Sequence, residues 1–362
     1  LAVSALMLAW ATWYWIEQPF RKRGNPALAT QRSVFAASGA VGAVFLFLGI
    51  AGHAGSGFDW RLNAEVLRFA KAESDQAKSE CNFNMMQARD VNLNHPQTQC
   101  ISSSSDRADV MLIGDSHMWA LADGLREALL AAEIENYFIS HTSCLPLNGF
   151  HFFDSGRRQD CEKFLTDAFS WAKDAEVSTI VISARFPLYL NGDRYNNGEG
   201  GVESGDPSWV DLADRTTSNW DDNERRSRVL SEYEKRIREL SQEFNVVLIY
   251  PIPEAGWNVP SYAAKVAHLT EGNGSVTTSY SAYKERTEQV NGLFDLLVSE
   301  LPNVHAARVH EVLCDESAGR CINADETAVY YYDDDHLSNA GSRLVAPTII
   351  EAIEEAVERV EK

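Results

Sequence analysis

The stretch Val110-Met111-Leu112-Ile113-Gly114-Asp115-Ser116-His117 decides the fold of this chain. Its first four residues form a continuous apolar run, which is typical of a short strand buried on both faces of a parallel sheet. A helical pattern follows from Met118 to Ala131. A serine between such a strand and such a helix lies at the carboxyl edge of the sheet, where open α/β folds bind their ligands. The sequence therefore predicts a functional site at Ser116.

Strands and helices continue to alternate towards the C-terminus. Further strands are predicted at 137–140, 179–183, 246–251 and 304–312, and further helices at 162–173, 224–244, 281–301 and 339–360. This order implies right-handed crossovers and a parallel sheet covered by helices on both faces. The stretch 192–223, rich in Gly, Asn, Asp and Ser, is expected to be a long insertion near the site. We therefore predict an α/β fold from about Asp109 to the C-terminus.

A second motif, Tyr332-Asp333-Asp334-Asp335-His336-Leu337-Ser338, precedes the last predicted helix. A serine hydroxyl is a weak nucleophile and needs a base, and that base needs a carboxylate to fix its tautomer. An Asp three residues before a His can face Nδ1 while Nε2 faces the serine. We predict Ser116 as nucleophile, His336 as base and Asp333 as the residue that orients the base. The alternatives are a helix-capping role for Ser116, a solvated acidic loop, and a cation site made of the three aspartates.

Two apolar runs stand at the start of the chain, from Leu1 to Ile16 and from Val34 to Ala51. A membrane-spanning helix needs ~20 mostly apolar residues. The first run looks cut short and the chain begins with Leu, so we expect a fragment of a longer membrane protein. The first run has no basic residues ahead of it, which is unlike a signal peptide. The alternative is that both runs are buried core helices of a soluble protein.

Charge predicts how the two apolar runs are oriented. Between them lie all four basic residues of segment 1–56, namely Arg21, Lys22, Arg23 and Arg32. Positive charge in short loops stays on the cytoplasmic side, so the chain after about His53 is expected outside the cytoplasm. With Glu17 the segment carries +3, and subtracting this from the total of −20 leaves −23 on residues 57–362. Such an acidic domain is not expected to bind nucleic acid, which requires clustered basic charge.

The six cysteines fall into three sequence-local pairs: Cys81 with Cys100, Cys144 with Cys161, and Cys314 with Cys321. This pattern predicts three loop-closing disulfides and an oxidising compartment. Other pairings are formally open, because sequence alone does not choose among them. A metal site is the competing interpretation, but no pair has the Cys-x-x-Cys spacing that places two thiolates on one zinc.

The Gly-Asp-Ser at Ser116 and the Asp-x-x-His at His336 together resemble the first and last sequence blocks of the SGNH/GDSL hydrolase family. The resemblance covers the chain from about Asp109 to the C-terminus. It implies a three-layer, flavodoxin-like fold with Ser116, His336 and Asp333 as its catalytic triad. It implies no cofactor and no metal.

The chain departs from that family where further oxyanion donors are expected. The third block has Ala184-Arg185-Phe186 in place of an asparagine, and Thr142-Ser143-Cys144 stands where the glycine of the second block belongs. Arg185 is a candidate to donate to the oxyanion or to hold an acidic sugar, and the alternative is a structural ion pair. Loss of one such donor costs roughly 100- to 1000-fold in rate, so we expect poor hydrolysis of a bound acyl ester.

The segment Trp15-Ile16-Glu17-Gln18-Pro19-Phe20-Arg21 resembles the end of the membrane domain of acyltransferase family 3. In one branch of that family an extra membrane helix leads to a periplasmic SGNH domain, and Cys144-Leu145-Pro146 and Pro251-Ile252-Pro253-Glu254 are similar to such domains. The implied boundaries are the last acyltransferase helix at 1–20, a cytoplasmic loop at 21–33, a transmembrane helix at 34–53, a partly helical periplasmic linker at 54–108, and the SGNH domain at 109–362.

The resemblance implies an O-acyltransferase, most often an acetyltransferase, in a bacterial inner membrane with its C-terminal domain in the periplasm. Its partners would be an acyl donor delivered by the membrane domain and an envelope glycan acceptor such as lipopolysaccharide. One alternative is a carbohydrate acetylesterase that uses the same triad, and another is a catalytically idle glycan-binding domain. His117 is expected to have a structural or substrate-edge role. Up to two of four aromatic residues are expected to face sugar: Trp119, Phe186, Tyr189 and Trp257.

Overall fold

The computed structural model describes residues 2–18, 30–55, 57–78, 81–82, 100–102, 108–153, 161–270 and 275–358. These residues form two compact units, Leu1–Asn63 and Ala64–Lys362. Each unit is described by itself.

The first unit is helical. Helix α1 (Ala2–Thr12) runs into the π-helical turn η1 (Trp13–Glu17), α3 covers Gln31–Ala54, and a short 3-10 turn, η3, covers Asp59–Arg61. Helix α3 starts at a capping box, in which Thr30 and Ser33 each bond the other's backbone amide. Its 24 residues have a mean hydropathy of 2.2 and none is buried, so it is long and apolar enough to cross a membrane. Residues 21–29 of the predicted loop at 21–33, with three of the four basic residues, lie outside the described residues, and its last three residues, 31–33, begin α3.

The second unit is built on a five-stranded parallel sheet with the strand order β2-β1-β4-β6-β8. The strands are β1 (Val110–Gly114), β2 (Asn136–Ser140), β4 (Thr179–Ser183), β6 (Asn245–Ile249) and β8 (Val304–Ala307). All five β1 residues are buried, as its continuous apolar run predicts. The order changes direction at β1, whose neighbours are β2 and β4, and Ser116 follows β1 at this switch point.

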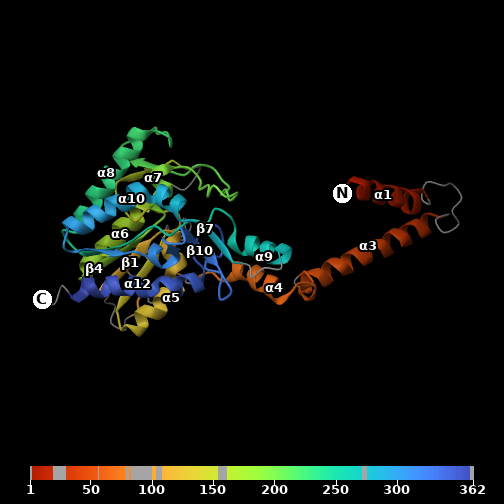
Figure 1. Ribbon diagram of the computed structural model, residues 1–362, viewed down its shortest axis with the longest axis horizontal. Helices are drawn as coiled ribbons and strands as arrows, with labels where there is room; N and C mark the ends of the chain where they lie inside the picture. The colour runs from red at the N-terminus through yellow and green to blue at the C-terminus, as the bar shows by residue number, and fades with distance from the viewer. Residues whose placement is uncertain are drawn as a thin grey trace. The chain divides into compact units, whose positions relative to one another are not determined.

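Helices cover both faces of this sheet. Helices α5 (Ser116–Ala131) and α12 (Asn339–Glu358) pack together on one face, and α6 (Cys161–Asp174), α8 (Asn223–Leu240) and α10 (Tyr280–Glu300) lie on the other (Figure 1). At the contact of α5 with α12, a Cβ on Gly124 would lie 2.5 Å from Ser342 Oγ, so the helices approach closely there. The predicted three-layer α/β fold with a parallel sheet is confirmed.

Smaller elements surround the sheet. Strand β3 (Phe150–Phe152) pairs antiparallel with β5 (Val210–Leu212), and a side sheet has the order β7-β10-β9. The side sheet contains β7 (Val276–Ser279), β9 (Cys314–Asp315) and β10 (Arg320–Ala324). The shorter helices of this unit are α4 (Ala64–Lys71), η4 (Ala72–Ser74), α7 (Phe186–Asn191), α9 (Val259–Thr270) and α11 (His310–Leu313). The sequence patterns did not predict α7, α9 or the side sheet. The strand predicted at 304–312 was too long, because it ends at Ala307 and His310 starts a helix.

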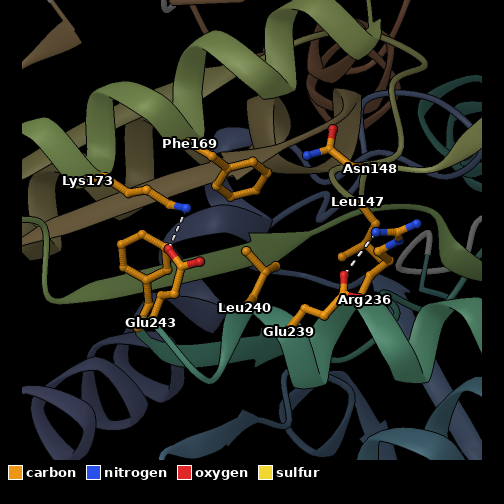
Figure 2. A pocket seen from close by; sticks show the side chains of 9 residues that line it. Leu147, Asn148, Phe169, Lys173, Arg236, Glu239, Leu240 and Glu243 are labelled. Carbon is orange, nitrogen blue, oxygen red and sulfur yellow. Dashed lines mark hydrogen bonds and ion pairs between the residues drawn. The ribbon is translucent and has the colours of Figure 1, made fainter.

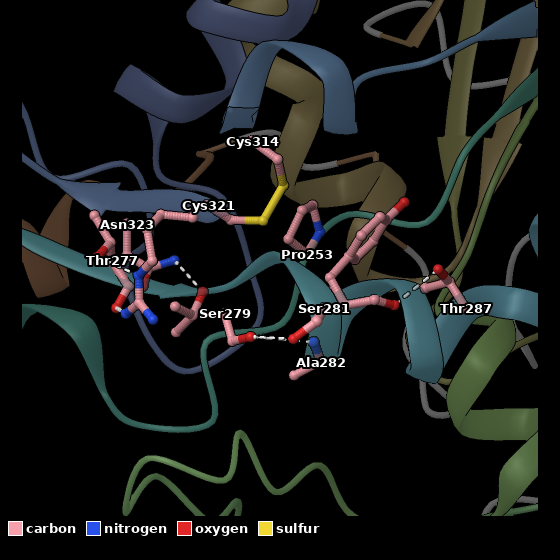
Figure 3. Close-up of a disulfide and its surroundings, with 12 residues drawn as sticks. Pro253, Thr277, Ser279, Ser281, Ala282, Thr287, Cys314, Cys321 and Asn323 are labelled. Carbon is pink, nitrogen blue, oxygen red and sulfur yellow. Dashed lines mark hydrogen bonds between the residues drawn. A yellow bond between two sulfur atoms is a disulfide. The ribbon is translucent and has the colours of Figure 1, made fainter. Parts of the chain in front are cut away.

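The three disulfides join the predicted cysteine pairs, Cys81 to Cys100, Cys144 to Cys161 and Cys314 to Cys321. That prediction is confirmed, and no cysteine is free. The Cys314–Cys321 bond joins β9 to β10 at the side sheet (Figure 3). The Cys81–Cys100 bond precedes β1 in sequence, and the Cys144–Cys161 bond joins the segment after β2 to the start of α6. Residues before 109 also belong to the compact unit, because α4 packs against α9 with Val66 and Phe69 buried.

Candidate active site

Ser116 stands where β1 turns into α5. At the end of β1, a Cβ on Gly114 would lie 2.0 Å from the carbonyl oxygen of Ser183 on β4, so only glycine allows this approach. Asp115 is the N-cap of α5, and its Oδ1 accepts from the His117 amide at 2.8 Å. Capping is therefore the function of Asp115, and the Ser116 hydroxyl is left to face the pocket.

The loop before α12 brings the other two predicted residues to Ser116. Nε2 of His336 lies 2.7 Å from Ser116 Oγ, and Nδ1 lies 2.8 Å from Oδ2 of Asp333. The other oxygen of Asp333 accepts from the backbone amides of Asp335 and His336 at 3.1 and 2.8 Å, which holds the carboxylate in place. The three side chains thus form one hydrogen-bonded row, the geometry that activates a serine hydroxyl. Their catalytic role stays a prediction.

Asp335 is a further acidic residue at His336 that sequence reasoning did not single out. It is 3% exposed, and its Oδ1 lies 3.1 Å from Nδ1 of His336. Its Oδ2 lies 3.0 Å from both His117 Nε2 and Arg185 Nη1. No sequence signal separates it from its neighbours in a run of three aspartates, because the loop conformation decides which of them points inward.

The guanidinium of Arg185 is enclosed by carboxylates. Its Nε bonds Glu254 at 2.7 Å, and its Nη1 and Nη2 bond Glu203 at 2.9 and 2.6 Å. Nη2 also contacts Glu254, and Nη1 contacts Asp335. Four of the five N–H donors of the guanidinium therefore donate to Glu203 or Glu254, and Asp335 adds an ion pair at 3.0 Å. The geometry therefore favours the ion-pair alternative for Arg185 over an oxyanion or acidic-sugar role.

This charge cluster shifts the titration of the groups around His336. Burial would lower the pKa of His336, but Asp335 and Asp333 outweigh it and raise that pKa well above its usual value. Burial likewise opposes ionisation of Asp335, yet Arg185 and His336 hold its pKa well below the usual range. Burial and the charges of Asp335 and Asp333 raise the pKa of Asp334 to about 6.

The loop aspartates could hold a cation only by giving up these contacts. Ligand atoms of Asp333, Asp334 and Asp335 lie within 4.8 Å of one another, as do those of His117, Asp335 and His336. However, Asp333 and Asp335 both face His336, and Asp335 also faces Arg185. The arrangement favours the hydrogen-bonded site over the cation site.

A pocket of about 370 Å³ opens at Ser116. Besides the residues already described, it is lined by Asn82, Trp119, Thr142, Ser143, Leu188, Tyr189, Arg194, Ser208 and Tyr332. Of the four aromatic residues considered for sugar contact, Trp119 and Tyr189 line the pocket, whereas Phe186 is fully buried and Trp257 stacks on Tyr262. Tyr189 is 3% exposed and donates to Asp115 Oδ2 at 2.7 Å, so Trp119 is the better candidate for a sugar platform.

A second hollow, of about 170 Å³, lies between α6 and α8. Phe169 and Leu240 line it, and the ion pairs Lys173–Glu243 and Arg236–Glu239 border it at 2.6 and 2.9 Å (Figure 2). Its lining contains no pairing of a nucleophile with a base. The pocket at Ser116 is therefore the candidate active site.

Sequence comparison agrees with this geometry. The family model of the SGNH domain (fused to AT3 domains) matches residues 80–351. The chain belongs to this SGNH family. Among curated proteins, no sequence match was found. The match does not include the first 79 residues, so the acyltransferase membrane domain at 1–20 stays a prediction.

The SGNH domain is similar in structure to the lipopolysaccharide acetyltransferase periplasmic domain of Salmonella ser. Paratyphi A. The identity is 15% and the TM-score 0.50, over 80% of this chain and 97% of that one. At this identity the likeness shows the fold.

Arg185 and Ser143, where the sequence analysis expects the third and second family blocks, both line the pocket at Ser116. Arg185 stands at the third-block position, and its backbone amide donates to Asp115 Oδ2 at 3.0 Å. At the second-block position Ser143 has φ +60°, a left-handed conformation that favours glycine, and it lines the pocket.

Proposed function

We propose that this SGNH domain is an O-acyltransferase that places an acyl group, in the first instance acetyl, on a cell-envelope polysaccharide through Ser116. The observation that carries the proposal is the row of hydrogen bonds from Asp333 through His336 to Ser116, at 2.8 and 2.7 Å, inside an open pocket. This row supplies a nucleophile and a base, and the pocket supplies room for a sugar.

The reaction has two balanced steps. First, Ser116 Oγ attacks the carbonyl carbon of the donor ester while His336 Nε2 takes the hydroxyl proton, and the leaving group departs with that proton. Second, a sugar hydroxyl attacks the acyl-serine ester, again giving its proton to His336. That proton then returns to Ser116 Oγ, and the acylated sugar leaves. Asp333 stabilises the imidazolium in both steps.

The N-terminus of α5 would stabilise the negative charge that develops on the acyl oxygen during attack. The amide of Ser116 is the first of the 16-residue helix, and the amides of a first helical turn point towards an anion with the helix dipole behind them. The unusual third block supports transfer, because Arg185 is bonded to three carboxylates and supplies no donor there. Slow hydrolysis would leave the acyl-serine time to meet a sugar.

The domain organisation proposed for this activity has 1–20 as the last acyltransferase helix, 34–53 as a membrane helix and the SGNH domain in the periplasm. Three disulfides support an oxidising compartment, and α3 supports membrane attachment. The acyl donor would reach Ser116 from the membrane domain. The name of the similar Salmonella structure, a periplasmic domain of a lipopolysaccharide acetyltransferase, also supports this arrangement.

The test uses the full chain, purified in detergent from an oxidising compartment. Wild type, Ser116→Ala and the control Ser231→Ala, an exposed serine on α8, are incubated with p-nitrophenyl acetate and envelope oligosaccharides. Mass spectrometry reads acetyl-Ser116 and acetylated sugar. We expect both products in wild type and the control, and neither in Ser116→Ala.

Two other results would change the assignment. Fast acetate release without acetylated sugar would make the domain a carbohydrate acetylesterase. Sugar binding with no acetyl-Ser116 in wild type, together with unimpaired glycan acylation by Ser116→Ala in cells, would make it a glycan-binding domain.

A further inference from the structure

The pocket at Ser116 includes a residue that precedes the domain's first sheet strand. Asn82 lies 34 residues before the nucleophile, yet it lines the same pocket as Ser116 and His336. It is half-buried. Its chemistry fits a need of the site, because a side-chain amide nitrogen is a strong neutral donor.

The backbone at Asn82 is held against the end of β2. Asn82 pairs with Ser140 as an isolated parallel bridge, and the Ser140 amide donates to the Cys81 carbonyl at 3.0 Å. The disulfide Cys81–Cys100 fixes the residue next to it. His141, the residue after β2, donates its amide to the Gly114 carbonyl at 2.9 Å, so the end of β2 is tied to the end of β1 two residues before Ser116.

The side chain of Asn82 is also oriented. The Thr142 hydroxyl donates to Asn82 Oδ1 at 3.1 Å. The amide oxygen is thereby occupied, and the amide group presents Nδ2 on its other branch. Among the described residues, Nδ2 has no hydrogen-bond partner. Thr142 also lines the pocket, so both residues of this pair belong to its lining.

The third-block position, which carries an asparagine donor to the oxyanion in the wider hydrolase family, has no free side-chain donor among the described contacts of this domain. The third block carries Arg185, whose guanidinium is paired with Glu203, Glu254 and Asp335 and whose backbone amide donates to Asp115. Arg185 belongs to the β4 side of Ser116, whereas Asn82 belongs to the β2 side. Asn82 and Ser116 line the same pocket, and an oxyanion there is stabilised by donors that face it together with the Ser116 amide.

We propose that Asn82 Nδ2 is a catalytic donor that stabilises the oxyanion formed when Ser116 attacks an acyl group. This inference rests on the proposed function of Ser116. The side-chain amide of Asn82 would then replace the asparagine amide that the third block lacks. The Cys81–Cys100 disulfide would hold Asn82 in place for this role.

The experiment compares Asn82→Ala, Asn82→Asp and the control Asn219→Ala, an exposed asparagine in the loop before α8, in the full chain. Turnover of p-nitrophenyl acetate is divided by the amount of acetyl-Ser116 formed in the first burst, so misfolded molecules do not count. We expect kcat per acylated site to fall roughly 100- to 1000-fold in both Asn82 variants, with KM changed little. The control should keep the wild-type rate.

A second variant separates donation from packing. Thr142→Val removes the hydroxyl that orients the amide but leaves Asn82 itself, and we expect a loss of several-fold in kcat. The carbonyl stretch of acetyl-Ser116, read by infrared spectroscopy, should move to higher frequency in Asn82→Ala because a donor to the carbonyl oxygen is lost. A merely structural role would leave that frequency in place.

The two proposals fail in different ways. If wild type forms no acetyl-Ser116, the proposed function fails and this inference falls with it. If acetyl-Ser116 forms but both Asn82 variants keep the wild-type kcat and carbonyl frequency, only the role of Asn82 is overturned. The oxyanion would then be held by backbone amides such as those of Ser116 and Ser143. If the Asn82 variants fail to fold, an unchanged rate and frequency in Thr142→Val overturn the inference.

Discussion

The pocket at Ser116 has one wall beside β2 and another beside β4, and the two are held by different interactions. The β2 wall contains Asn82 and Thr142, which are neutral, and a disulfide fixes it at Cys81. We call the other side the β4 wall: it contains Arg185, which follows β4, and the two carboxylates Glu203 and Asp335 that pair with it, and all three are charged. Both walls have to hold polar groups still in a site that opens to water.

The two solutions have different physical costs. Buried charges lose hydration, so the β4 wall is stable only while every charge keeps its partner. Glu254 shows this balance, since burial would raise its pKa but Arg185 and Arg286 keep it lowered. The β2 wall uses a covalent bond and neutral hydrogen bonds, so it needs no charge balance but depends on an oxidising compartment.

The largest expected effect comes from removing the central cation of the β4 wall. Arg185→Met leaves three buried carboxylates without their shared partner, and we expect a loss of about 3–5 kcal/mol in the free energy of unfolding. Urea unfolding of the full chain in detergent measures it. The control is Arg194→Met. The Arg194 side chain is 28% exposed, forms an ion pair with Glu203 and donates from Nε to the Asp206 carbonyl, and its removal should cost less than about 1 kcal/mol. Equal losses in the two variants would contradict the picture of a charge-balanced wall.

The next largest effect should come from opening the β2 wall. The Cys81–Cys100 bond closes a loop with a sequence separation of 19, and Cys81→Ser with Cys100→Ser should cost about 3 kcal/mol. Because Asn82 adjoins the bond, kcat per acylated site should fall as well. The matched pair is Cys314→Ser with Cys321→Ser, with a separation of 7, for which we expect about 2 kcal/mol and an unchanged kcat. A larger kcat loss in the second pair would reverse the assignment of the β2 wall to the site.

The third effect concerns Asp335, which contacts both Arg185 of the β4 wall and His336, the proposed base. His336 must be neutral to take a proton, and its pKa is raised, so activity should increase with pH until the imidazole is deprotonated. Asp335→Asn removes one of the charges that raise this pKa. The rising limb of the pH profile should therefore move to lower pH, while the plateau falls roughly 10- to 100-fold because the imidazolium is less stabilised.

The groups that face Asp335 from neighbouring elements are Arg185 after β4, His117 on α5, and Asp333, Asp334 and His336 of its own loop. Glu254 and Glu203 lie beyond Arg185. The control is Asp214→Asn, an exposed aspartate after β5, which should leave the profile in place. A pH limb that stays fixed in Asp335→Asn would assign the shift to Asp333 alone.

The same ion pair affects stability with a defined sign. Because the folded pKa of His336 is raised, its contribution is full below the unfolded pKa of about 6.5 and is lost as the pH rises through the folded value. Asp335 acts in the opposite direction. Because its folded pKa is lowered, its contribution to stability is full above the unfolded pKa of about 4 and is lost as the pH falls through the folded value.

The sequence alone determined the features that depend on local chemistry. The apolar run before Gly114 predicts a buried strand, and Asp115 and Ser116 begin the helix that follows. The spacing of Asp333 and His336 places carboxylate and imidazole together within one loop, so their contact needs no distant partner. The cysteine pairs were also predictable, because each closes a short loop.

Only the tertiary structure decided the features that depend on distant partners. Arg185 meets Glu203 and Glu254, 18 and 69 residues away, and nothing local says which carboxylates will enclose it. Asn82 reaches the pocket because a segment before the sheet pairs with the end of β2. Asp335 differs from its two neighbours only in the direction in which the folded loop points it. Pairing across such distances depends on which strands lie side by side in the sheet, and local residue patterns do not determine that order.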